Sequence, residues 1–341
     1  MMARSGAVLV TGATGFIGAR LVEELLRRGE AVRALVRPTS DRDRLPPGRV
    51  TPVEGDVLAP ATLADAIAGC SRVFHLAGYA RNWARDPATY HENNVVGTRN
   101  VLAAAAAAGA EKIVLTSTIV TLGPTPPGAI GDEGMTRTTS RFFTTYEESK
   151  AIAEREALRL AALGTPVVVV NPTRVFGPGT LTEGNSVTVM IDLRGRGRFP
   201  FLPAGGSNVG NYALVDDVVR GHLLAMERGR PGERYILGGE NVTLKAFLEL
   251  VDTISGTRHV AINLPPALAR AYACIEERKA RWLGVYPRIT PGWVATFLQD
   301  WAFSSAKAER ELGYAITPLE DGMRLTHEWL LDRRARRGEA R

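Results

Sequence analysis

The amino-acid sequence predicts an α/β fold, in which a doubly wound parallel sheet is joined by a smaller C-terminal substrate domain interleaved with it. Two observations predict this fold. Strand-like apolar runs alternate with helical patterns from Val8 to Pro172, which is typical of parallel βαβ units. Beyond Pro172 the alternation ends, and glycine-rich loops separate short helices from single strands. The 341 residues, 45% hydrophobic and 23% charged, are ordinary for a globular protein, and this composition excludes a disordered or fibrous chain.

The first strand, Val8–Thr11, runs into a turn with a glycine at every third position and then into an amphipathic helix. Gly12 would allow the tight turn, Gly15 would let the backbone approach a pyrophosphate, and Gly18 would let the helix pack closely on its strand. A bare glycine trio is more often loop punctuation, but the flanking strand and helix favour a phosphate site. We also assign to this coenzyme site the turn residues Thr14, Phe16 and Ile17.

The second strand indicates which coenzyme is bound. The helix before it ends near Gly29, the strand spans Ala31–Val36, and the next residue is Arg37. An acidic residue there would hold a ribose 2′-hydroxyl, whereas an arginine suits a 2′-phosphate. The sequence therefore favours NADP over NAD. Arg42 and Arg44 follow, and a solvated loop explains these two equally well.

The next strands and helices continue the alternation. We expect strands at Val50–Glu54, Arg72–Ala77 and Lys112–Leu115, and helices from Pro60 to Gly69, from Asp86-Pro87 onwards and through the alanine run Ala103–Ala108. Asp56 could accept from an adenine amino group, although a turn carboxylate is nearly as good an explanation. The small residues Ala77 and Gly78 would let the backbone pass close to the coenzyme ribose. We add to the coenzyme site the neighbouring residues Val57 and Leu76.

The reacting groups follow the fifth strand, which ends in Thr116-Ser117-Thr118. Tyr146 and Lys150 come later on a helical segment, and their spacing of four puts both on one helix face. A tyrosine and a lysine at this spacing usually lie on a solvent-exposed helix face and have no catalytic role. After a glycine turn and a hydroxyl-rich strand end, the pair indicates general acid/base chemistry, because an ammonium and an oxidised nicotinamide nearby favour the phenolate. A threonine hydroxyl opposite would steady the substrate oxygen.

At these residues the chain resembles the extended branch of the short-chain dehydrogenase/reductase family, which includes NAD-dependent epimerases and dehydratases. The resemblance rests on five motifs: TGATGFIG at 11–18, NVVGT at 94–98, TST at 116–118, YEESK at 146–150 and NPT at 171–173. It implies a Rossmann fold and a catalytic set of Thr118, Tyr146 and Lys150 with Asn94 as helper. Thr118 stands where the family usually has serine. The resemblance also implies that Lys150 holds the nicotinamide ribose, and the coenzyme site gains Thr116, Tyr146, Pro172, Thr173 and Val175.

Within that branch the chain is most similar to the dihydroflavonol 4-reductase-like group, which includes proteins labelled hopanoid-associated sugar epimerases. Segments 37–42, 83–87, 221–243 and 304–314 carry this similarity. Two departures bear on the substrate. Gly210 and Leu214 stand where sugar-nucleotide epimerases have an arginine and a histidine, which weakens a nucleotide-sugar substrate. Gly123 stands where plant flavonoid reductases have an asparagine, so dihydroflavonol is doubtful too.

We expect residues 1–175 to form the Rossmann domain, with residues 209–240 returning to it. Residues 176–208 and 241–331 would form the substrate-binding lid, with helices at Val242–Ile254, Pro265–Leu283, Pro291–Trp301 and Leu319–Leu331, and Ser304-Ser305 as an N-cap. We place near the substrate Asn82, Trp83, Thr118 and Tyr212. Four aromatic residues fit a pocket wall, although a core role is commoner for such spacing: Trp282, Trp293, Phe297 and Trp301. A packed lid helix explains 265–283 better than membrane contact, since charges interrupt its apolar face.

Charge and cysteine content limit the partners. The net charge of +6 comes from residues spread along the chain, with one concentration at Arg333–Arg337, which a frayed, solvated tail (332–341) explains better than nucleic-acid binding. Cys70 and Cys274 provide no disulfide framework and no metal-ligand spacing. No apolar run approaches the roughly 20 residues of a membrane span. We expect a cytoplasmic protein with a small-molecule substrate, no metal, no nucleic-acid partner and no stable membrane insertion; the resemblance adds homodimer formation.

The favoured function is an NADP-dependent oxidoreductase that transfers a hydride between nicotinamide and a secondary alcohol or ketone of a small, cyclic or hydrophobic substrate, with Tyr146 as general acid/base. The alternative is a nucleotide-sugar epimerase or dehydratase that retains NAD or NADP. A non-enzymatic coenzyme sensor on the same fold is a third possibility. The presence of both Tyr146 and Lys150 argues against it.

Overall fold

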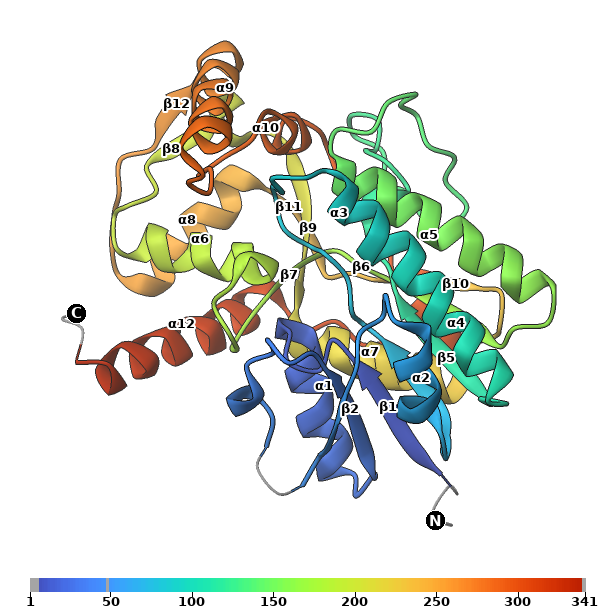
Figure 1. Cartoon of the computed structure of the whole chain (residues 1–341). Coiled ribbons are helices and arrows are strands. Elements are labelled where there is room, and N and C mark those ends of the chain that lie inside the picture. The colour runs from blue at the N-terminus through green and yellow to red at the C-terminus, as the bar shows by residue number, and fades with distance from the viewer. Residues whose placement is uncertain (1–5, 47–48, 339–341) are drawn as a thin grey trace.

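A seven-stranded parallel sheet lies at the centre of the computed structural model, which describes residues 6–46 and 49–338 (Figure 1). Every neighbouring pair in the sheet is parallel. In order across the sheet, the strands are β10 (Arg234–Leu237), β6 (Val167–Pro172), β5 (Lys112–Thr116), β4 (Cys70–His75), β1 (Ala7–Thr11), β2 (Val32–Val36) and β3 (Thr51–Glu54). The doubly wound Rossmann sheet expected from the sequence is confirmed.

Helices cover both faces of this sheet, and this explains its continuous apolar strands. One face packs against α1 (Phe16–Arg27), α7 (Val215–Arg228) and α11 (Ala306–Leu312). The other face packs against α2 (Pro60–Ile67), α4 (Gly97–Ala107) and α5 (Thr145–Ala162). With cover on both sides, all six residues of β6 are buried, so its valine run needs no polar alternation.

The strand order reverses direction next to β1, and this fixes where a ligand can bind. The chain leaves β1 towards β2 and β3 on one side, then returns to β4 on the other. Helices that follow β1 and β4 therefore diverge, and a crevice opens beyond the carboxyl ends of these strands.

A smaller lid lies over that crevice. It has a three-stranded sheet of β11 (Glu240–Thr243), β9 (Val209–Leu214) and β7 (Arg174–Phe176), and a parallel pair, β12 (Ile262–Leu264) and β8 (Phe201–Pro203). Its helices are α6 (Ser186–Gly195), α8 (Leu244–Ser255), α9 (Pro266–Leu283), α10 (Pro291–Phe297) and α12 (Leu319–Arg336). The remaining helical segments are α3 (Ala88–His91), a π-helical turn (Glu92–Val96) and the 3₁₀ turns Arg42–Arg44, Ile119–Thr121, Glu183–Asn185 and Ala204–Gly206. The lid has its own core, in which Phe247 stacks on Tyr212 with 4.0 Å between ring centroids.

Several lid boundaries differ from the sequence prediction. Residues 209–214, expected in the segment returning to the Rossmann domain, form β9 of the small sheet; α7 and β10 are the parts that reach the main sheet. The helix expected from Val242 starts at Leu244, because Thr243 pairs with Val209 and its side chain caps the helix. The helix expected to end at Trp301 ends at Phe297.

The C-terminal basic run is helical where a frayed tail was expected. Helix α12 continues through Arg336, and Arg334 is buried against α6 with 2.6 Å between its guanidinium and the Asp192 carboxylate. This pairing explains why the helix passes Leu331, the end expected from the sequence. Within the described part of the chain, no helix has the length and apolar character needed to cross a membrane.

Candidate active site

Two neighbouring cavities lie beyond the carboxyl ends of the sheet strands. The larger has a volume of about 410 Å³ and lies between the sheet and the lid. The smaller, of about 230 Å³, lies beyond β2 and β3. Both are lined by Gly12, Gly15, Leu76 and Gly78, so the glycine turn separates the two chambers.

The turn between β1 and α1 needs glycine, because a side chain at Gly12 or Gly18 would collide with neighbouring backbone atoms. Gly12 has φ +72°, and a Cβ added there would lie 2.7 Å from the backbone nitrogen of Ala77. A Cβ on Gly18 would lie 2.1 Å from the carbonyl oxygen of Gly12, so only glycine lets α1 start this close to the strand. The start of α1 then faces the larger cavity through Phe16, Ile17 and Gly18. This cradle at a helix N-terminus fits the pyrophosphate of a dinucleotide.

The smaller cavity contains the residues expected at the adenosine end. Its lining includes Thr14, Arg37, Asp56, Val57, Ala77 and Gly78. Arg42 forms an ion pair with Glu54 and Arg44 with Asp41, whereas no ion pair of the Arg37 guanidinium occurs in the described structure. One Asp56 oxygen accepts the Leu58 amide at 2.9 Å, as a turn carboxylate does, while Asp56 also reaches the cavity wall.

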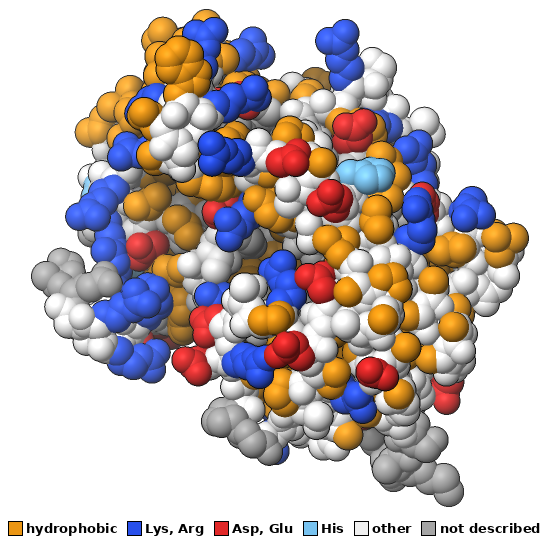
Figure 2. Space-filling model, viewed as in Figure 1, with side chains coloured by type: hydrophobic (Ala, Val, Ile, Leu, Met, Phe, Trp, Pro, Cys, Tyr) orange, Lys and Arg blue, Asp and Glu red, His pale blue; other side chains and the backbone are white. Residues whose placement is uncertain are grey.

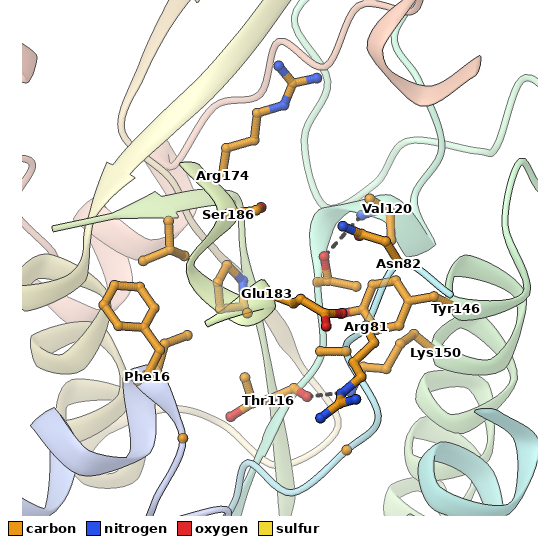
Figure 3. A pocket seen from close by; sticks show the side chains of 18 of the residues that line it. Phe16, Arg81, Asn82, Thr116, Val120, Tyr146, Lys150, Arg174, Glu183 and Ser186 are labelled. Atoms are coloured by element: carbon orange, nitrogen blue, oxygen red, sulfur yellow. Dashed lines mark hydrogen bonds between the residues drawn. The ribbon is translucent and has the colours of Figure 1, made fainter. Parts of the chain in front are cut away.

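Tyr146 and Lys150 line the larger cavity from the first turns of α5 (Figure 3). Thr118, two residues after the end of β5, lines the same cavity. The Lys150 ammonium donates to the Thr116 carbonyl at 2.7 Å, which ties α5 to the end of β5. Burial raises the pKa of Tyr146 to about 12, against a hydrogen bond with Thr118 that lowers it. Burial lowers the pKa of Lys150 to about 8, against the carboxylate of Glu154, which raises it. Of these two groups, Lys150 therefore has the pKa closer to neutral pH.

Asn94 shapes the backbone beside the reacting groups. It lies in the π-helical turn between α3 and α4, a local feature that is common at functional sites. Its side chain accepts the Tyr79 amide at 2.7 Å and donates to the Tyr79 carbonyl at 3.2 Å and to the Ser149 hydroxyl at 2.9 Å. It thereby holds the loop after β4 against the helix that carries Tyr146.

Glu154 was missed in the sequence analysis, although it organises the floor of the site. This buried carboxylate accepts hydrogen bonds from Ser117, from Thr121 at 2.8 Å and from Asn171 at 2.8 Å, and it pairs with Arg234 at 3.0 Å. Asn171 also donates to the Thr118 carbonyl at 3.1 Å, so the network fixes the strand end that presents Thr118. The sequence did contain a signal for Glu154: it follows Lys150 by four residues, which places both side chains on the same helix face.

Glu147 was also missed, and it fixes the start of α5. Thr144 and Glu147 have capping-box spacing, and the Thr144 hydroxyl accepts the Glu147 amide at 3.1 Å. The buried Glu147 carboxylate accepts the Phe143 amide at 2.6 Å and pairs with Arg137 at 2.5 Å. These contacts hold the turn in which Tyr146 sits.

The substrate side of the larger cavity includes some of the predicted residues. Asn82, Trp293 and Phe297 line it, together with Arg81 and Glu183. The Glu183 carboxylate in this lining accepts a hydrogen bond from the Tyr286 hydroxyl. The remaining coenzyme residues named from the sequence, Thr116, Pro172, Thr173 and Val175, also line this cavity.

Two residues predicted near the substrate do not line the cavity. The Trp83 amide donates to the Tyr286 hydroxyl at 3.0 Å, and its ring packs on that tyrosine. Tyr212 is buried in the lid core, where its hydroxyl accepts from Arg174 at 3.2 Å. Of the other aromatic residues considered, Trp301 is buried and Trp282 is exposed.

Arg174 places a cation in the wall of the larger cavity that the sequence analysis did not identify. Its guanidinium stacks 4.7 Å from the Phe297 ring centroid and extends away from Tyr146 (Figure 3). A Cβ on Gly210 would lie 2.5 Å from this guanidinium, so the glycine makes room for it. Arg174, on β7, therefore occupies the space beside Gly210.

Comparisons with known proteins identify the family and the fold. The sequence model of the NAD dependent epimerase/dehydratase family matches residues 8–238. A Synechocystis sp. protein provisionally named dihydroflavonol 4-reductase is 34% identical over 332 residues, which are 96% of this chain and 95% of that protein. A Stigmatella aurantiaca protein named 4-hydroxy-2-methyl-3-oxo-4-farnesyl-3,4-dihydroquinoline-1-oxide ketoreductase is 34% identical over 334 residues, which are 97% and 96% of the two chains. The crystal structure of gox2253 has a TM-score of 0.82 at 38% identity and covers 96% of this chain and 98% of that chain.

Proposed function

From its membership of the NAD-dependent epimerase/dehydratase family, we propose that the chain is an NADP-dependent ketone reductase. It is an NAD(P)-dependent oxidoreductase of the extended short-chain dehydrogenase/reductase branch of that family. The observation that carries the proposal is the meeting of Tyr146, Lys150 and Thr118 beside the glycine turn. The reaction interconverts a ketone and a secondary alcohol of a cyclic or hydrophobic substrate.

Each side chain has a separate task in this reaction. Bound NADPH would supply the hydride from C4 of its nicotinamide. Gly12–Gly18 would hold its pyrophosphate, and Lys150 would hold its nicotinamide ribose. The Thr118 hydroxyl orients the substrate oxygen, and the protonated Tyr146 phenol gives that oxygen its proton. With its pKa raised to about 12, Tyr146 stays protonated at neutral pH, which suits the reducing direction. Lys150, as an ammonium, compensates negative charge that develops on Tyr146.

The preference for NADP rests on Arg37. A guanidinium at the end of β2 matches a 2′-phosphate, and a hydrogen bond to a charged group contributes about 1.5–3 kcal/mol. For Arg37→Ala we expect KM for NADPH to rise roughly 10- to 100-fold, with KM for NADH nearly unchanged. Steady-state kinetics with both coenzymes measure this.

Arg42→Ala is the matched control, since Arg42 is already paired with Glu54 at 2.7 Å. It should leave both KM values near those of the wild type. If Arg37→Ala affected NADPH and NADH alike, or neither, the assignment of the 2′-phosphate to Arg37 would be wrong.

The pH dependence of reduction follows from Lys150. Its ammonium is present below its pKa of about 8 and is lost as the pH rises through that value. The kcat/KM for ketone reduction should therefore be level below pH 8 and decline above it. In Lys150→Arg the guanidinium stays charged, so the decline should move to higher pH. Wild-type and variant profiles that coincide would contradict this role of Lys150.

The cavity supports a hydrophobic substrate. Val187, Met190, Trp293 and Phe297 contribute apolar surface opposite the reacting groups. The name of the Stigmatella aurantiaca relative describes a cyclic ketone with a farnesyl chain. The test is a panel of cyclic and prenylated ketones incubated with NADPH, in which we expect alcohol to form in a one-to-one ratio with NADPH consumed. Absence of turnover across the panel would count against the proposal.

A second candidate is a nucleotide-sugar epimerase or dehydratase that retains its coenzyme, and Arg174 is the observation that favours it. Within the described residues no carboxylate pairs with this arginine, so it can hold a phosphate at the far end of the cavity. The purified protein would then carry tightly bound NAD or NADP and convert UDP-sugars without added coenzyme. A freely exchanging coenzyme favours the reductase.

A further inference from the structure

Helix α9 of the lid turns its large apolar side chains outward. It packs on α10 through the small residues Ala269 and Ala273. The exposed apolar residues of α9 and the turn after it are Leu268, Tyr272, Ile275, Trp282, Leu283 and Val285, and we call these six residues the α9 surface. Trp282 is 89% exposed and Leu283 69% exposed. The buried positions of this helix are Ala269, Ala273, Glu276 and Ala280, so its inner side holds small side chains and one paired carboxylate, while its large apolar side chains lie outward.

The neighbouring strand pair extends the apolar area. Phe201 on β8 and Ile262 on β12 are exposed, as is Val260 just before β12. Figure 2 shows hydrophobic side chains gathered at the upper left, over α9 and the β8–β12 pair, with Lys and Arg among them. An exposed apolar area bordered by polar groups is typical of an interaction site.

The charges around this area are mostly positive. Segment 258–288 contains six Lys or Arg residues and two Glu residues. Glu276 is buried and pairs with Lys279 at 2.9 Å, and Glu277 pairs with Arg281 at 2.9 Å. Arg258, Arg270, Arg278 and Arg288 remain as surplus positive charge around the apolar residues. Two copies of this face would repel each other, so a second copy of the chain fits it poorly.

We propose that the α9 surface docks on an anionic phospholipid bilayer. A helix with Trp, Leu and Ile on one side and Arg or Lys beside them lies in the plane of a membrane, with its apolar side chains at the acyl boundary and its cations at the phosphates. The contact is peripheral, because the helix lies along the surface and does not cross the bilayer.

The α9 surface connects directly to the mouth of the larger cavity. Two residues after Gly284, which ends α9, the Tyr286 hydroxyl accepts the Trp83 amide at 3.0 Å and bonds to Glu183. Glu183 and Asn82, next to Trp83, line the cavity. A bilayer against α9 would therefore lie beside the mouth of the larger cavity, and a lipophilic ketone could enter the cavity from the bilayer. This route for the substrate rests on the proposed reductase function, whereas the docking itself does not.

The test is flotation of the full chain with vesicles of phosphatidylcholine alone and of phosphatidylcholine mixed with phosphatidylglycerol. We expect binding to the mixed vesicles, weaker binding at high salt and little binding to phosphatidylcholine alone. In the double variant Trp282→Asp/Leu283→Asp the bound fraction should fall roughly tenfold or more. Leu163→Asp is the matched control, since Leu163 is 72% exposed and lies outside the α9 surface; it should bind like the wild type.

Reduction of a water-soluble ketone separates docking from catalysis. The double variant should keep wild-type turnover of that ketone, because the α9 surface does not line the cavity. Vesicle binding without any ketone turnover would keep the docking proposal and overturn the proposed function. Equal vesicle binding by the wild type and the double variant would overturn the docking proposal. It would also be overturned if the wild type did not bind vesicles but formed a dimer that the double substitution disrupts.

Discussion

Replacing Tyr146 by Phe is expected to lower kcat for ketone reduction about 100- to 10,000-fold, the usual contribution of a general acid. The change removes only the hydroxyl that hydrogen-bonds with Thr118 and gives its proton to the substrate oxygen. Lys150 keeps its bond to the Thr116 carbonyl, and the glycine turn is untouched. The Kd for NADPH should therefore stay near the wild-type value while turnover is lost, and calorimetry and steady-state kinetics measure the two effects separately.

Tyr272→Phe makes the same change at an exposed tyrosine on α9 and should leave kcat unchanged. If Tyr146→Phe retained wild-type turnover, or lost NADPH binding together with turnover, the phenol would not be the proton donor.

Replacing Glu154 by Leu is expected to lower the free energy of unfolding by about 3–5 kcal/mol, because it breaks a buried ion pair and leaves its partner without a counter-charge. Arg234 would lose its carboxylate, and Ser117 and Asn171 would lose an acceptor in the core. The end of β5 that carries Thr118 would then be less well fixed. Urea unfolding measures the stability, and kcat should fall even where the folded protein is recovered.

Glu156→Leu on the same helix is the matched control. Glu156 pairs with Arg99 at 2.7 Å at the surface, where such a pair contributes about 0–1 kcal/mol. Glu154→Gln keeps an acceptor for Ser117 and Asn171 and should recover part of the activity. Equal stability of the Glu154→Leu and Glu156→Leu proteins would show that the network is not structural.

The sheet and helix α5 could be predicted because their signals are local. The glycines at 12, 15 and 18 need only the strand before them and the helix after them to be understood. Tyr146 and Lys150 share a helix face through their spacing alone. A resemblance carried by several short motifs selected Thr118 from the three hydroxyl residues at the strand end and added Asn94, which no local pattern marks.

The rest of the site depends on contacts between distant segments. Arg234 reaches Glu154 across 80 residues, and Arg174 stands in the space that Gly210 leaves. Strand β11 has no alternating pattern and forms because β9 offers a free edge. Tyr212 was predicted near the substrate, but its ring stacks on Phe247 and is buried.

The end of α12 and the exposed side of α9 were also not predicted from the sequence. The α12 helix extends past Leu331 because Arg334 finds Asp192 on α6. Helix α9 packs in the lid, as the sequence analysis expected, but its packed side holds three alanines and Glu276, while its large apolar residues lie outward. The partner of α12 lies 142 residues away in the sequence, whereas α9 packs on α10, the next helix in the chain.

The most direct test of the central claim follows a deuterium atom from C4 of labelled NADPH through one turnover of a ketone that the panel identifies. We predict that the label appears on the carbinol carbon of the alcohol with net oxidation of NADPH, and that Tyr146→Phe does so about 100- to 10,000-fold more slowly. Mass spectrometry that found no label in the alcohol, or label transfer at the wild-type rate in Tyr146→Phe, would contradict the account.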